Sequence, residues 1–285
     1  RLWFMVGIVV AAVTVATAVS GIQKAMKHVS NINVYGFAIF LIFLLVFSNA
    51  SFLFNLSTEA LGGFAGTFIE RILITGESVG TQWPQWWTTF YWFSWMAWAP
   101  TSGAFMGQIA YGRKVKHVLG LYVGLCASVS ALWMVLVSGT SLWVQTSGLF
   151  DLVASYDRGV ENVPYDMLGA LPLGNLIIPL FVVLIFLSTI TACNSNCIAM
   201  AGISTQGINP DSPDSPMWLK LVWCVVPMAV GYMIATVGVN GVKIIANFGG
   251  MFAALIMIGA TASLGILIKN YKKFDKTGSG SSDKV

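Results

Sequence analysis

The segment Gln82–Arg113 contains the side chains of this sequence that are best suited to binding a cation. Its aromatic residues recur at positions i, i+4, i+8 and i+11, which places them on one face of a helix. These residues are Trp87, Tyr91, Trp95 and Trp98, with Trp92 beside them. Aromatic ring faces attract a quaternary ammonium by about 2 kcal/mol or more for each desolvated contact. The stripe therefore predicts a binding face for an onium cation.

Packing is the alternative explanation for these aromatic residues, and both explanations stay open. Membrane tryptophans gather at the two water interfaces, which accounts for Trp83, Trp86 and Trp87 without a ligand. Trp98 lies about 16 Å deeper than Trp87, because each helical residue advances the chain by about 1.5 Å. An indole at that depth needs a partner for its N–H group or an aqueous cavity, which favours ligand recognition.

The residues from Pro100 to Gly103 follow the aromatic stripe directly. Proline removes a backbone hydrogen bond and glycine adds conformational freedom, so we predict that the helix breaks here. Broken helices at membrane depth occur beside protein or a cavity, and they mark the binding sites of transporters.

A second segment, Ser188–Asn196, is unusually polar although it lies within an apolar stretch of the sequence. It contains four hydroxyl and two amide side chains in nine residues. Hydroxyl groups in membrane helices often bond to the carbonyl one turn earlier, which needs no ligand. The alternative is that these side chains line a cavity, in which threonine hydroxyls and exposed carbonyls supply part of the coordination shell of a sodium ion.

Composition and hydropathy assign both segments to a membrane protein. Only 9% of the 285 residues are charged, whereas soluble domains carry about 25%. Seven segments have about the 20 apolar residues needed to cross a hydrocarbon core of roughly 30 Å. They are Leu2–Val19, Val34–Leu53, Trp87–Ile109, Leu119–Gly139, Leu176–Ala201, Trp218–Val237 and Ile244–Ile268. We therefore predict an all-α polytopic membrane protein without a nucleic-acid partner.

Charged side chains are confined to the ends of these segments and to their connections. Eleven of the fifteen Lys and Arg residues fall in alternate connections, so that side and the C-terminus are predicted to be cytoplasmic. The interior of the spans holds no nucleophile–base pair and no metal-ligand set, so we expect no enzyme and no metal other than sodium. The start at Arg1, directly before an apolar run, indicates a fragment of a longer protein.

Two connections have distinct patterns. Ser57–Gly80 places apolar residues opposite charged ones at helical spacing, which predicts a helix lying in the membrane interface. Thr146–Pro172 contains five charged residues and is predicted to be an exposed loop.

The run from Trp87 to Pro100, WTTFYWFSWMAWAP, followed by Gly112 and Arg113, resembles the signature of the betaine/carnitine/choline transporter family. The tract from Ser20 to Asn33 is similar to the loop after the sixth helix of that family. The similarity continues to about Tyr271 and corresponds to the sixth to twelfth helices of the family.

This resemblance implies a transporter fold of two inverted five-helix repeats with discontinuous helices. Residues 1–53 would be two transmembrane helices that end the first repeat, and residues 54–82 the interfacial amphipathic connector. Residues 83–270 would be the second repeat of five transmembrane helices, and residues 271–285 a disordered cytoplasmic tail. A homotrimer in a prokaryotic plasma membrane is also implied.

The resemblance assigns roles to individual residues. Trp95 and Trp98 match family positions that line the substrate path, and the substrate-binding set is completed by Trp92, Tyr91 and Ser94. Ser94 departs from the family, which usually has tryptophan at that position.

In sodium-coupled members, a Thr-Ser-Ala-Asp-Ser element contributes side-chain oxygens to sodium, and Thr191 to Ser195 stand in its place here. Thr191 is retained, but Ala192 replaces a serine ligand. The predicted ion-coupling set is Thr191, Ser188, Ser195 and Phe105, the last matching a phenylalanine proposed to face a second sodium site.

The sequence thus predicts a secondary active transporter for a quaternary-ammonium solute such as glycine betaine, choline or carnitine, working by alternating access in the lipid bilayer. Sodium would be its only cofactor. The alternatives are a sodium-independent onium exchanger of the same family and, less favoured, an aromatic-lined channel or sensor.

Overall fold

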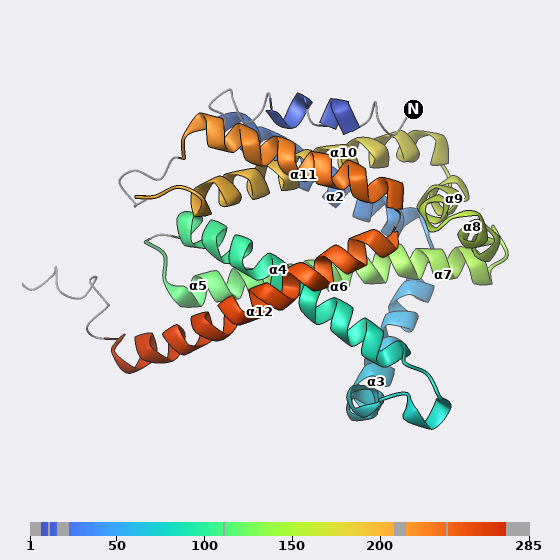
Figure 1. Cartoon of the computed structure of the whole chain (residues 1–285). Coiled ribbons are helices and arrows are strands. Elements are labelled where there is room, and N and C mark those ends of the chain that lie inside the picture. The colour runs from blue at the N-terminus through green and yellow to red at the C-terminus, as the bar shows by residue number, and fades with distance from the viewer. Residues whose placement is uncertain are drawn as a thin grey trace, which may run out of the picture. The chain divides into compact units, whose positions relative to one another are not determined.

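The structure, a computed structural model, describes residues 7–10, 12–15, 23–110, 112–207, 215–237 and 239–271. These residues form helices joined by short turns, with no β-strand among them (Figure 1). Among the described residues, four helical segments are long and apolar enough to cross a membrane. They are His28–Phe47, Val115–Thr146, Gly174–Ile203 and Lys243–Lys269. The prediction of an all-α polytopic membrane protein is therefore confirmed.

The chain divides into two compact units. The first comprises Arg1–Ile74 and Gln108–Met228, and the second comprises Thr75–Gly107 and Ala229–Val285. Most of the predicted span Leu2–Val19, and the tail after Tyr271, lie outside the described residues.

The helices of the first unit follow one another from α2 to α10 and into α11. Their bounds are Gln23–Phe47 (α2), Ala50–Leu73 (α3), Val115–Leu119 (α5), Cys126–Trp133 (α6), Gly139–Thr146 (α7), Leu152–Arg158 (α8), Val163–Gly169 (α9), Gly174–Ile203 (α10) and Met217–Val237 (α11). The second unit contains α4, Trp83–Ile109, and α12, Val239–Lys269. Helix α11 runs from the first unit into the second.

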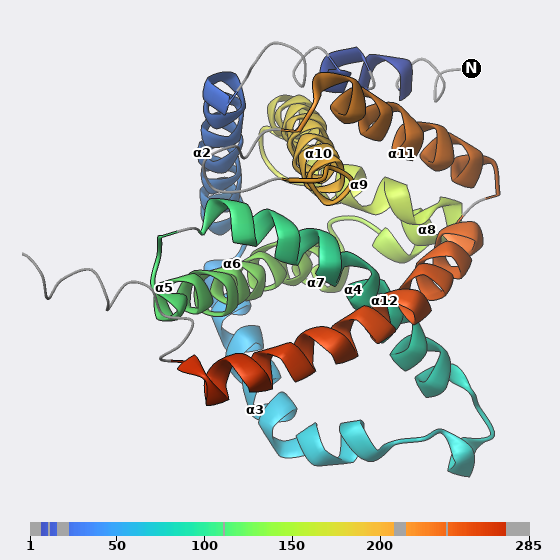
Figure 2. The same cartoon turned by 60° about the vertical axis from the view of Figure 1, so that its left-hand side comes forward.

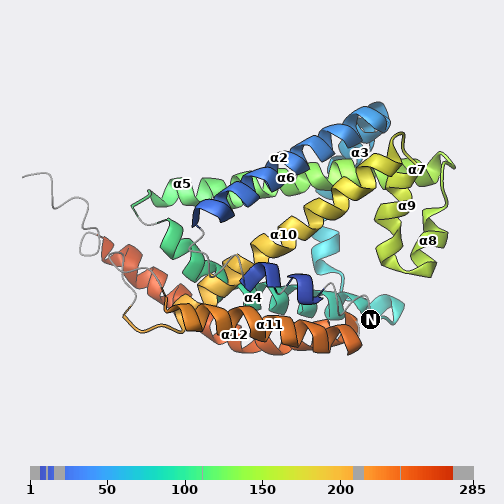
Figure 3. The same ribbon diagram turned by 90° about the horizontal axis from the view of Figure 1, so that it is seen from above.

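The first unit is organised around the contact between α2 and α10 (Figure 3). The rings of Phe40 and Phe181 stack with their centroids 5.0 Å apart and their planes at 20°. A side chain at Gly36 would collide with Leu184, so glycine allows the two helices to approach closely, as small residues do at membrane helix interfaces.

The helices α5, α6 and α7 form one continuous rod (Figure 3). Two π-helical segments, Gly120–Leu125 and Met134–Ser138, join the three α-helical parts. The rod includes the predicted span Leu119–Gly139, but the sequence pattern did not predict the π turns. Such turns occur mostly as single wide turns within helices and often lie near functional sites.

The prediction that Thr146–Pro172 is a loop is wrong, although most of its residues are exposed as predicted. This segment folds into α8 and α9, and Met167 and Leu168 are 1% and 0% exposed. Asp166 joins the two helices, because its Oδ2 accepts hydrogen bonds from Ser155 Oγ at 2.6 Å and Arg158 Nη2 at 2.7 Å. The prediction rested on the charged residues of the segment, whereas four of its apolar residues, Leu152, Met167, Leu168 and Leu171, belong to the core.

The predicted span Val34–Leu53 is interrupted in the structure. Helix α2 ends at Phe47, and α3 begins at Ala50 after Asn49, whose side chain accepts a hydrogen bond from Phe52 N at 3.0 Å. An asparagine at this position is a strong helix start signal. Helix α3 covers the predicted connector helix as far as Leu73, and it changes direction along its length (Figure 2). The placement of this connector in the membrane interface stays a prediction.

Candidate functional site

Helix α4 carries the aromatic stripe and starts at a turn with defined polar contacts. Gly76 has a φ of 79°, in the left-handed region that favours glycine. The Trp83 N–H donates to Thr81 Oγ1 at 3.2 Å. Pro84 follows in the first turn, where a missing N–H has no helical partner to lose. These contacts set where the helix starts, and hence the positions of the rings along it.

The predicted helix break at Pro100 is wrong. Helix α4 is continuous from Trp83 to Ile109 with Pro100 inside it. Proline removes one intrahelical hydrogen bond, but membrane helices tolerate that loss when neighbouring groups or local adjustments satisfy the freed carbonyl. The glycine at position 103 also keeps helical geometry.

The first half of the stripe consists of rings in mutual contact. The centroid of Trp87 lies 5.8 Å from that of Trp83, 5.9 Å from Phe90 and 5.6 Å from Tyr91. These separations lie in the range in which aromatic pairs attract each other. The i, i+4 spacing read from the sequence therefore produces a continuous aromatic face from Trp83 to Tyr91.

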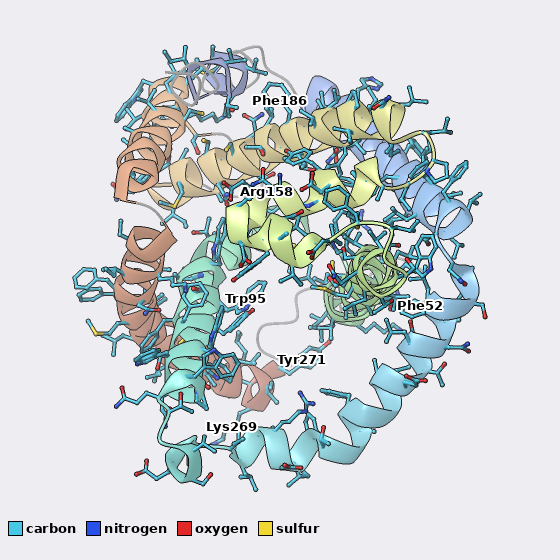
Figure 4. The ribbon with its side chains drawn as sticks, turned by 90° about the vertical axis from the view of Figure 1, so that its right-hand side faces the viewer. Phe52, Trp95, Arg158, Phe186, Lys269 and Tyr271 are labelled. Carbon is cyan, nitrogen blue, oxygen red and sulfur yellow. The ribbon has the colours of Figure 1, made fainter. Side chains whose placement is uncertain are left out.

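The second half of the stripe is open. Trp95 is 70% exposed and Trp98 is 53% exposed, and Trp92 and Tyr91 are also more than half exposed. Figure 4 shows Trp95 projecting from α4. Since the chain's own core does not cover these rings, packing within the described residues does not account for them. Their role in substrate binding stays a prediction.

The predicted site residue Ser94 has a different environment from its neighbours. Its Oγ atom is buried and has no hydrogen-bond partner among the residues that the structure describes. The Oδ1 atom of Asn247, on α12, is also buried and also has no hydrogen-bond partner among the described residues. A buried polar atom without a partner costs about 1–3 kcal/mol, so Ser94 lies at a position where a polar partner would be stabilising.

Helices α4 and α12 cross in close contact within the second unit (Figure 1). A side chain at Gly250 would overlap the backbone of Phe93, and one at Gly249 would lie 3.9 Å from the Cβ of Ala97. The absence of a side chain at Gly250 is thus what allows α12 to lie against the backbone of α4. The stripe-bearing helix is held in place by this contact.

Lys243, near the start of α12, contacts the aromatic stripe. Its Nζ atom lies 5.0 Å from the ring centroid of Trp87 and 5.7 Å from that of Phe90. Both distances are within the roughly 6 Å over which a cation is attracted to a ring face. No local sequence pattern connects Lys243 to these rings, because they lie about 150 positions earlier in the chain.

The predicted ion-coupling residues of α10 lie in the first unit and are engaged in hydrogen bonds. Thr191 Oγ1 donates to Leu187 O at 2.8 Å, and Ser195 Oγ donates to Thr191 O at 3.0 Å. Ser188 Oγ accepts from Asn33 Nδ2 on α2 at 2.7 Å. These are the contacts expected of hydroxyl groups in membrane helices, although each oxygen keeps a lone pair for an ion. Sodium coupling therefore stays a prediction.

Phe105, the remaining predicted ion-site residue, is half-buried on α4 in the second unit. The four cysteines, Cys126, Cys193, Cys197 and Cys224, are free thiols. Among the described residues, no three His, Cys, Asp or Glu side chains are grouped so as to hold a metal ion.

The hydrogen bond between Ser188 and Asn33 gives a stability prediction. Replacing Ser188 with alanine should lower the free energy of unfolding of the full-length protein by about 1 kcal/mol, because a half-buried amide loses its acceptor. Thermal unfolding in detergent measures this change. Thr189→Val is the matched control, since Thr189 is exposed and bonds only to Ile185 O one turn earlier. Equal unfolding temperatures for the two variants would show that the interhelical bond contributes nothing.

Comparison with known proteins agrees with the transporter features. A sequence model of the betaine/carnitine/choline family of transporters matches residues 2–273. The chain is 26% identical over 269 residues to an osmo-independent choline transporter of Acinetobacter baylyi, covering 90% of this chain and 48% of that protein. It is 26% identical over 260 residues to a probable glycine betaine transporter of Desulfitobacterium hafniense, covering 88% of this chain and 51% of the relative.

A third relative is an uncharacterised transporter of Mycobacterium tuberculosis, 27% identical over 241 residues, which cover 84% of this chain and 40% of that protein. The chain thus spans about half the length of the curated relatives that it matches. The family consists of transporters, in agreement with the prediction that the chain is not an enzyme. The match covers nearly every residue, including the aromatic helix, and the chain belongs to the betaine/carnitine/choline transporter family.

Proposed function

We propose that the full-length protein is a secondary active transporter of a quaternary-ammonium solute of the glycine betaine, choline or carnitine type. The observation that carries this proposal is the open aromatic face of α4, with Trp95 and Trp98 more than half exposed in a member of an onium-transporter family. Relatives named as choline and glycine betaine transporters support the same solute class.

The chemistry of recognition would be cation–π attraction. A trimethylammonium group has no N–H to donate and spreads its charge over its methyl groups, so ring faces suit it better than carboxylates with their strong hydration. Each desolvated ring contributes about 2 kcal/mol or more. Trp95 and Trp98 would make the main contacts, with Trp92 and Tyr91 beside them, while the buried Ser94 hydroxyl would meet a polar group of the solute only after a local rearrangement.

Transport would proceed by alternating access between two inverted five-helix repeats, in which residues 83–270 form the second repeat. Such repeats rock against each other around a site near the membrane midplane. The distribution of basic residues favours a cytoplasmic C-terminus in a prokaryotic plasma membrane, and family resemblance favours a homotrimer.

Sodium is the first candidate for the driving ion. Its candidate coupling residues are Thr191, Ser188, Ser195 and Phe105. A sodium-independent onium exchanger is the second candidate. It is favoured by Ala192, which stands where sodium-coupled members have a serine ligand, and by the hydroxyls of Thr191 and Ser195, which already donate to carbonyls.

Counterflow tests the proposal. Full-length protein in liposomes loaded with unlabelled choline or glycine betaine should accumulate the labelled solute transiently above its equilibrium level, because a carrier exchanges one solute for another. A channel or sensor would give no such overshoot. Sodium symport predicts that replacing sodium with potassium abolishes net uptake of the solute, whereas an exchanger is insensitive to the replacement.

A further inference from the structure

The start of α12 places a cation in a corner formed by two aromatic rings. The rings of Trp87 and Phe90 meet edge to face, with centroids 5.9 Å apart and an interplanar angle of 76°. Lys243 Nζ lies 5.0 Å from the first centroid and 5.7 Å from the second. Two rings at a steep angle around a positive charge are an arrangement that also suits an onium headgroup.

The position of Lys243 follows from the packing of its own helix. Lys243 precedes Gly250 by seven residues, which is about two helical turns and places both residues on the same face of α12. Gly250 lies against the backbone of Phe93, and Phe90 is almost one turn before Phe93 on α4. The contact of α12 with α4 therefore directs the Lys243 side chain toward the Trp87–Phe90 corner.

Among the residues that the structure describes, the Lys243 ammonium group has no carboxylate partner. Within the described part of the chain, the salt bridge within 4.0 Å joins Arg158 to Asp166, and no carboxylate pairs with Lys243. The half-buried lysine is thus held by the ring faces. A tethered group acts at a high effective concentration, so a free cation competes with it at a disadvantage.

We propose that Lys243 is a built-in occupant of the Trp87–Phe90 corner that prevents an onium solute from binding there. The inference rests on the proposed function, because it concerns where along α4 an onium solute is held. With the corner filled, the proposed solute contacts are the exposed rings further along α4, of which Trp95 lies about 12 Å and Trp98 about 16 Å from Trp87. Lys243 thereby restricts the aromatic stripe to one onium site instead of two.

Equilibrium dialysis of purified full-length protein with radiolabelled choline tests this inference. The wild type should bind one choline per chain at saturation, and Lys243→Gln should bind two, because the corner becomes free. Lys243→Arg should bind one, since a guanidinium also stacks on ring faces. Lys243→Met is a second neutral variant that keeps the apolar stem in place if the glutamine variant fails to fold.

The double variant Lys243→Gln/Trp87→Ala should return to one choline per chain, because the corner then lacks its larger ring. A stoichiometry of one for both neutral variants would overturn the inference while leaving the proposed function in place. Binding of two cholines per chain by Lys243→Arg would also overturn the inference, since the second site would then open without loss of the positive charge. Absence of choline binding to the wild type would overturn both the inference and the choline form of the proposed function.

Discussion

Replacing Gly250 with alanine is expected to force α12 away from α4 and to abolish solute uptake by the full-length protein. The new Cβ would lie 2.5 Å from both the carbonyl carbon and the Cα of Phe93. These are backbone atoms of a helix, so they cannot rotate away as a flexible side chain does. Overpacking of this kind costs about 1–3 kcal/mol or more, and here it also shifts the helix that carries the stripe.

Thermal unfolding in detergent and uptake into liposomes measure the two consequences of Gly250→Ala. Two other glycines on the same helix are matched controls. A Cβ at Gly249 would meet Ala97 at an ordinary 3.9 Å, and one at Gly259 would meet no atom within 4 Å. Gly249→Ala and Gly259→Ala should therefore keep both stability and uptake. If Gly250→Ala behaves like Gly259→Ala, α4 and α12 do not pack as described.

Truncation of Trp95 or Trp98 is expected to weaken onium binding by about 30-fold, because the loss of one desolvated cation–π contact of about 2 kcal/mol corresponds to that factor. Both rings are largely exposed, so their removal leaves the core of the described residues intact. Trp95→Ala and Trp98→Ala should thus keep the wild-type unfolding temperature while the half-saturating solute concentration rises.

The matched control for these substitutions is Trp86→Ala, which removes an indole of similar exposure, 67%, from the first turn of the same helix. Trp86→Ala should leave solute affinity near the wild-type value. Trp95→Phe, which keeps a ring face of lower cation affinity, should lie between wild type and Trp95→Ala. Equal solute affinities of Trp95→Ala, Trp98→Ala and the wild type would show that these rings of α4 do not belong to the binding site.

The local geometry of the aromatic helix could be predicted from the sequence because it depends on spacing alone. Residues four apart on a helix lie one above the other, and the contact of Trp87 with Tyr91 at 5.6 Å follows directly. Apolar length likewise predicted helices at the four described segments that are long and apolar enough to cross a membrane, since the requirement of about 20 residues is a property of the bilayer rather than of the fold.

Features that depend on contacts distant in sequence could not be predicted. The ammonium of Lys243 reaches Trp87 only because α12 packs on α4, and the position of the glycine in that contact is known only from the structure. Thr146–Pro172 was predicted to be a loop because of its charged residues, but burial of Met167 and Leu168 against distant helices determines its fold.

Two backbone features illustrate the limit of local rules. Pro100 has a strong intrinsic tendency to end a helix, yet the flanking turns of α4 continue through it. The π turns at Gly120–Leu125 and Met134–Ser138 occur without any residue pattern that marks them in the sequence. In both cases the conformation is set by the surrounding helix rather than by the residues themselves.

If the aromatic face of α4 recognises the positive charge of an onium group, a neutral compound of the same shape should bind poorly. Choline and its neutral carbon isostere, 3,3-dimethylbutan-1-ol, can be compared as competitors of radiolabelled choline for binding to the full-length protein. The two compounds have nearly the same shape, so the neutral isostere should compete at least about 30-fold more weakly, the factor that corresponds to one cation–π contact. Equal competition by the two compounds would show that the site selects shape and apolar surface rather than charge, and that the rings of α4 do not recognise the cation.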